Sequence, residues 1–142
     1  MGKKLLYMCL MTIMMVVSMS AYALDKVGNV YQIGTADDLK AFAELVNGGE
    51  FNANAVLTAD INKGMDETMI GCANYDYQGS FDGQGHTIRI SAINQKAEGT
   101  AIFRNVGAQA LIQNLKVSGT IITDQKLAAG IAVWSRGFIR GC

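Results

Sequence analysis

Residues 79–90, which read GSFDGQGHTIRI, decide the expected fold. One short apolar alternation surrounds Phe81, a second includes Ile88 and Ile90, and a glycine-rich turn at 83–85 separates them. Alternation with a period of two indicates short strands, and glycines supply the positive φ angles that tight turns need. The chain from this stretch onward is therefore predicted to consist of strands and turns.

The same pattern returns twice further along the chain. Apolar and turn residues recur at 101–117 and 129–142, and Ile88, Ile112 and Ile139 occupy matching places that are 24 and 27 residues apart. A repeat of this length, built from short strands, is typical of a solenoid in which each coil stacks on the previous one. We therefore predict an all-β solenoid of about three coils over residues 51–142.

A helix is predicted upstream of the repeats, within residues 24–50. Thr35 is a good N-cap with Asp38 three residues later, and the sequence NGG at 47–49 supplies a stop. Between these signals, apolar residues fall on one face at helical spacing: Leu39, Phe42, Ala43 and Val46. We expect a short strand at 30–33 to lead into this helix, and the helix to cap the open end of the first coil.

Residues 1–23 have the features of a secretory signal peptide. Lys3 and Lys4 precede an apolar run at 5–17, and the sequence AYA at 21–23 presents small residues at the cleavage site. A transmembrane anchor would need about 20 apolar residues, and this run is shorter. Cys9 lies inside the run rather than at its end, which argues against a lipoprotein. We predict cleavage after Ala23, no stable membrane span afterwards, and a secreted, periplasmic or cell-surface protein.

The composition after cleavage excludes one class of partner. The signal segment holds two of the 12 lysines and arginines and none of the 12 aspartates and glutamates, so the remainder carries a net charge of −2. Such a chain has no basic surface for nucleic acid, and none is predicted as a partner. Cys72 and Cys142 are the cysteines that remain. Outside the cytoplasm a disulfide between them is permitted, and a pair of unlinked thiols is an equal alternative.

Four stretches resemble a known group of proteins. Residues 31–49 look like an N-terminal cap, 57–61 and 79–88 like first coils, and 128–139 like a GLUG-type repeat. Together they resemble the N-terminal segment of secreted bacterial right-handed parallel β-helix proteins, which are common on the surface of gut-type Bacteroidetes. The resemblance implies a pectate-lyase-like fold and a surface or adhesive role. It implies no activity, because one fold hosts unrelated functions.

The third repeat departs from the pattern that it resembles. Ala129 and Val133 stand where the repeat usually has glycine, and Gly141 stands where it usually has asparagine. The sequence also stops at Cys142, inside this coil. A solenoid normally ends on a polar cap. We therefore expect a truncated C-terminal end and a fragment of a longer protein.

No residue is predicted to be catalytic, to bind a cofactor or to ligate a metal. His86 lies near Asp82 in the sequence, but a general base also needs a cleft and a positioned partner, so a local hydrogen bond is the favoured interpretation. The aspartates of the loops lack the spacing of a Ca²⁺ site and are interpreted as solvated: Asp60, Asp66, Asp76 and Asp82.

Aromatic residues are the remaining candidates for ligand binding. Four of them are candidates for a platform that stacks on a sugar: Tyr75, Tyr77, Phe81 and Trp134. Phe81 is expected in the core, whereas Tyr75 and Tyr77 alternate, face the same side and are the preferred candidates. The sequence thus favours a non-catalytic segment for adhesion or glycan binding, with a glycan or a host or cell-surface ligand as partner. The alternative is the N-terminal piece of a polysaccharide lyase or glycoside hydrolase, for which the chain lacks a visible cluster of carboxylates.

Overall fold

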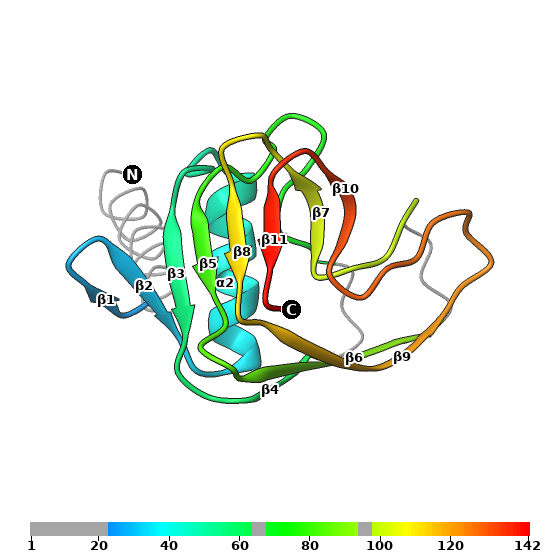
Figure 1. Ribbon diagram of the computed structural model, residues 1–142, viewed down its shortest axis with the longest axis horizontal. Coiled ribbons are helices and arrows are strands. Elements are labelled where there is room, and N and C mark those ends of the chain that lie inside the picture. Colours follow the sequence, from blue (N-terminus) through cyan, green and yellow to red (C-terminus); the bar gives the residue numbers. More distant parts are fainter. Residues whose placement is uncertain (1–22, 64–67, 94–97) are drawn as a thin grey trace, which may run out of the picture.

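The computed structural model describes residues 23–63, 68–93 and 98–142 (Figure 1). In these residues the chain forms, in order, β1 (Lys26–Val27), β2 (Val30–Ile33), α2 (Ala36–Asn47), β3 (Asn54–Leu57), β4 (Ile61–Lys63), β5 (Ser80–Asp82), β6 (Thr87–Ile93), β7 (Phe103–Val106), β8 (Leu111–Gln113), β9 (Lys116–Ile122), β10 (Ala132–Ser135) and β11 (Phe138–Arg140). The short strand expected at 30–33 is confirmed as β2.

The strands form three sheets. The largest has the order β1-β2-β3-β5-β8-β11, in which β1 pairs with β2 antiparallel and the other pairs are parallel. A three-stranded parallel sheet has the order β4-β6-β9, and β10 pairs in parallel with β7. Helix α2 lies behind β3, β5 and β8 in Figure 1, against the large sheet.

The predicted all-β, right-handed parallel β-helix of about three coils is wrong. The largest sheet is mixed, because β1 and β2 are antiparallel, and two small sheets and a 12-residue helix accompany it. The matching of isoleucines is also wrong in part. Ile112 does pair with Ile139, but Ile88 pairs with Val117 in a different sheet, and Phe81 is the residue beside Ile112. Spacing along a chain does not tell which strand lies beside which.

The predicted helix is confirmed as α2. The Thr35 side chain accepts a hydrogen bond from the Asp38 backbone at 3.1 Å, and the Asp38 carboxylate accepts one from the Thr35 backbone at 2.9 Å, which completes a capping box. The four apolar residues of the predicted face are all buried. The helix ends before Gly48, and Gly49 takes the positive φ of 125° that turns the chain away.

Aromatic rings join the helix to the large sheet. Phe42 of α2 makes edge or tilted contacts with Tyr31, Tyr77 and Phe81, at ring-centroid distances of 5.8 to 6.1 Å. Phe103 extends the cluster through an edge contact with Phe81 at 5.2 Å. Four of the five rings, all but Tyr31, are fully buried, so this cluster forms the centre of the core, and the prediction that Phe81 belongs there is confirmed.

Like β1 and β4, the last three strands of the chain, β9, β10 and β11, each lie at the end of a sheet and are paired on one side only within the described residues. Most of the large exposed apolar side chains of the described chain belong to them: Ile122, Trp134, Phe138 and Ile139. This side of the molecule therefore combines free backbone hydrogen-bonding groups with apolar surface.

Candidate ligand-binding groove

A row of three side chains crosses neighbouring segments at the base of the candidate site. Trp134 of β10 is in register with Asn105 of β7. On the other side of β7, Tyr77 forms a bridge with Val106, which places Asp76 beside Asn105. Parallel pairing therefore brings an aromatic ring, an amide and a carboxylate side by side, although they are far apart in the sequence.

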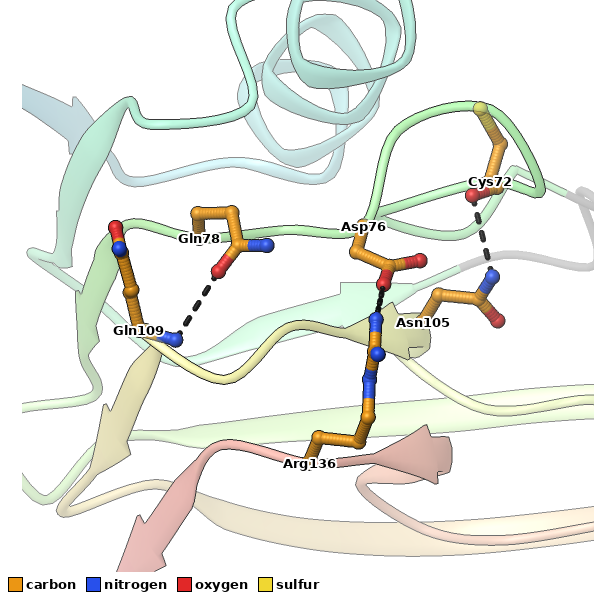
Figure 2. A network of polar contacts seen from close by, with 6 residues as sticks. All are labelled: Cys72, Asp76, Gln78, Asn105, Gln109 and Arg136. Carbon is orange, nitrogen blue, oxygen red and sulfur yellow. Dashed lines mark hydrogen bonds and ion pairs between the residues drawn. The ribbon is translucent and has the colours of Figure 1, made fainter.

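Polar contacts hold the loop that carries Asp76 against the two strands (Figure 2). Arg136 donates to the Asp76 carboxylate, and the Asn105 amide donates to the Cys72 carbonyl at 3.2 Å. Further along, the Gln109 backbone donates to the Gln78 side chain at 3.1 Å. Arg136 is largely exposed and Asp76 is mostly covered, so the ion pair lies at the surface of the groove.

The loop at 71–75 can take this shape because Gly71 begins it. Gly71 has a φ of 85°, and a Cβ built on it would lie 2.4 Å from the Asn105 carbonyl oxygen. A side chain at this position would therefore meet both backbone strain and a backbone atom of the neighbouring strand. Cys72 and Tyr75 then exchange backbone hydrogen bonds of 2.9 and 3.2 Å, which closes the loop.

Two hollows adjoin this loop. The larger, of about 520 Å³, is lined among others by Asp76, Arg104, Asn105, Trp134, Ser135 and Arg136. The smaller, of about 260 Å³, lies next to Phe51, Asn74, Tyr75 and Gln78. Ala73 and Asp76 line both hollows, so the two are contiguous. We call the combined surface the groove.

Each half of the groove offers an aromatic surface. Trp134 is 60 % exposed in the larger half. In the smaller half, Tyr75 is stacked on Phe51 with ring centroids 5.6 Å apart and planes only 11° from parallel. Carboxylate, amide and guanidinium groups lie between the two, so the groove combines flat apolar faces with hydrogen-bonding groups of both kinds.

The two tyrosines singled out from the sequence do not act together. Tyr75 is in the groove, but Tyr77 is fully buried in the core, where its hydroxyl donates to the Ala53 carbonyl at 2.9 Å. Burial raises the pKa of Tyr77 far above its ordinary value. Tyr77 therefore offers no face to a ligand. Tyr75 still belongs to the loop closed by its hydrogen bonds with Cys72, whereas Tyr77 bridges to Val106, so strict alternation does not hold for these two residues.

The sequence does not single out the other groove residues. Phe51, Arg104 and Arg136 belong to no motif, and the interpretation of Asp76 as a solvated loop residue is corrected by its mostly covered place in the groove. Trp134 is among the aromatic candidates but not among the preferred ones. These residues come together only because β10 pairs with β7 and because residues 71–78 pack against the other side of β7. Neither contact can be predicted from the spacing of residues along the chain.

The carboxylate nearest to His86 is Asp60 rather than Asp82. Nδ1 of His86 lies 3.4 Å from Oδ1 of Asp60, and the Thr87 backbone donates to the same oxygen at 2.8 Å. That backbone hydrogen bond, with a smaller contribution from His86, lowers the pKa of Asp60. The pair lies outside both halves of the groove.

Asp82 has a structural role in the large sheet. Burial acts to raise its pKa, but hydrogen bonds from the Gln84 backbone, the Asn114 amide and the Gln113 amide outweigh it, and the pKa is lowered. The donor distances are 2.8, 3.2 and 2.9 Å respectively. Asp82 thus connects β5 to β8 and to the turn that follows it.

Cys72 and Cys142 are both free thiols, so the unlinked alternative holds. Asp66 and residues 1–22 of the signal segment lie outside the described residues. Within residues 23–63, 68–93 and 98–142, no three histidine, cysteine or acidic side chains gather as metal ligands. In the same part of the chain, no helix has both the length and the apolar character for a membrane crossing.

The comparisons with known proteins give no match: no protein-family model, curated protein or solved structure is significantly similar to this chain.

Proposed function

We propose that this protein is an exported glycan-binding protein that holds its ligand in the groove without cleaving it. The observation that carries the proposal is the open face of Trp134 beside a strip of polar side chains. A sugar ring has an apolar face that packs on an aromatic ring, and hydroxyl groups around its edge that need partners. The groove supplies both kinds of contact on one surface.

The two aromatic surfaces favour a ligand of more than one sugar. Trp134 belongs to the larger hollow and the Tyr75–Phe51 stack to the smaller one, and the hollows are contiguous. A chain of sugars can contact both aromatic surfaces at once. The intervening Asp76 and Asn105 then face the ring hydroxyls.

Binding is favoured over hydrolysis by the acidic groups of the groove. Glycoside hydrolases usually use two carboxyl groups on either side of the scissile bond. Among the residues that line the two hollows, Asp76 is the carboxylate, and it is engaged by Arg136. The described residues that line the groove therefore do not include the second carboxylate that this chemistry requires.

Export is part of the proposal and rests on the sequence of residues 1–23. A positive start, a short apolar run and a small-residue cleavage site are the features that a signal peptidase requires. Expression of the full chain in a bacterium, followed by fractionation and N-terminal sequencing, tests it. We expect the protein outside the cytoplasm with Leu24 at its N-terminus, and a cytoplasmic protein that keeps Met1 would contradict export.

A glycan array with matched variants tests the binding. We expect the wild type to bind a defined set of oligosaccharides, Trp134→Ala to lose them, and Phe138→Ala to keep them. Phe138 is the matched control because it is an exposed aromatic residue of the neighbouring strand β11 that lines neither hollow. Equal binding by both variants would refute the groove as the site, and release of shortened sugars would establish the enzymatic alternative.

A further inference from the structure

The charges in the larger hollow distinguish its two arginines. Arg136 is neutralised by its ion pair with Asp76. Arg104, in β7, lines the same hollow and is half-buried, and no hydrogen bond or ion pair joins its guanidinium to another described residue. Two guanidinium groups and one carboxylate thus leave one uncompensated positive charge.

We propose that Arg104 binds the anionic group of an acidic sugar, so that the groove selects carboxylated or sulfated glycans over neutral ones. The inference rests on the proposed function and specifies its ligand class. A guanidinium presents its donors in a planar fork that matches a carboxylate or sulfate, and such charge-assisted hydrogen bonds are stronger than neutral ones.

The position of Arg104 suits this role for two reasons. It is next to Asn105, whose register partner is Trp134, so a sugar packed on the Trp134 ring would have its edge near β7. The backbone N–H of Arg104 already donates to the Ile70 carbonyl at 2.8 Å, which holds the residue in the sheet. The side chain therefore extends from a fixed backbone rather than from a mobile loop.

Titration of the purified protein with three related sugars tests the inference: lactose, sialyllactose and sulfated lactose. They share a neutral core, and the second and third add a carboxylate and a sulfate. We expect at least one acidic sugar to bind about tenfold more tightly than lactose, because a charge-assisted hydrogen bond contributes about that much. The acidic sugar that binds more tightly identifies the anionic group as a carboxylate or a sulfate. The preference should weaken as salt is added.

Variants at two arginines assign the effect to the groove. Arg104→Gln should abolish the preference for the acidic sugar over lactose, whereas Arg104→Lys should keep part of it, since the charge remains but the planar fork is lost. Arg89→Gln is the matched control, because it removes the same charge from an exposed position in β6, away from the groove. Circular dichroism confirms that each variant is folded.

The inference and the proposed function fail in different ways. If lactose binds as tightly as its acidic derivatives, or if Arg104→Gln keeps the preference, the inference is wrong and glycan binding stands. If only neutral sugars on the glycan array bind, the inference is again wrong. If no sugar binds in either experiment, both proposals are refuted.

Discussion

Arg136 and Asp76 form an ion pair although 60 residues separate them in the chain. The contact crosses β7 and joins the loop before β5 to the turn between β10 and β11. It thereby forms one wall of the larger hollow, and the Asp76 carboxylate balances the positive charge of Arg136, one of the two arginines there. The specificity that we infer for the groove depends on this pairing, because it leaves Arg104 as the uncompensated group.

The Asp76–Arg136 pair should contribute little to stability despite its place in the groove. Arg136 is largely exposed, and surface ion pairs of this kind are worth about 0 to 1 kcal/mol. A double-mutant cycle with Asp76→Asn and Arg136→Gln, followed by urea unfolding, should give a coupling energy in that range that decreases with added salt. A coupling of several kcal/mol, independent of salt, would show that the pair is desolvated.

Gly71 should be the more sensitive of two glycines with positive φ. Gly71→Ala places a Cβ against the Asn105 carbonyl, whereas at Gly28 a Cβ meets nothing within 4 Å. Both substitutions add the backbone strain of a left-handed residue, about 1 to 2 kcal/mol, but only Gly71→Ala adds a clash. The free energy of unfolding should fall further for Gly71→Ala, and sugar binding should weaken with it. Equal losses at the two sites would contradict the described loop.

Asp82 should make the protein less stable in acid. Its pKa is lowered in the folded state, so its contribution is fully present above the unfolded value near 3.8 and is lost as the pH falls through the folded pKa. Urea unfolding at about pH 6 and about pH 3 should show this loss for the wild type. Asp82→Asn should be less stable at the higher pH and show a smaller change between them. The same pH dependence in both proteins would rule out Asp82 as a source.

The exposed edge strands should promote self-association. The strand β11 is paired on one side and exposes Phe138 and Ile139, a combination that favours pairing with another chain. Sedimentation at increasing concentration should show less association for Ile139→Lys than for the wild type. Ala108→Lys adds the same charge at an exposed loop position and serves as the control. If Ala108→Lys lowers association as much as Ile139→Lys does, the decrease comes from the added charge and not from the edge strand.

Local features of the chain could be predicted because local physics determines them. The capping box of Thr35 and Asp38 and the apolar face of α2 depend on residues within three or four positions of one another, and both predictions are confirmed. The strand around Phe81 follows from alternation and a glycine turn, which are also local. The resemblance of residues 128–139 to a GLUG-type repeat stays a prediction.

The pairing of strands could not be predicted in the same way. Ile88 and Ile112 look equivalent in the sequence, but Ile88 lies in the sheet of β4 and β9, and Ile112 lies between Phe81 and Ile139. Which strands pair is decided by hydrogen bonds between residues far apart in the sequence, so local spacing does not reveal it. The antiparallel pair of β1 and β2 has no counterpart in the repeat at all.

The sequence alone thus determined the elements, through capping, periodicity and turn residues that act over a few positions. Only the tertiary structure decided that Tyr77 enters the core while Tyr75 remains in the groove, and that Trp134, Asp76 and Arg104 share one hollow. The physical reason is the range of the interactions. Hydrogen bonds between strands that are distant in the sequence assemble the groove. The free energy of this pairing depends on residues far apart in the chain, so no short stretch of sequence predicts it.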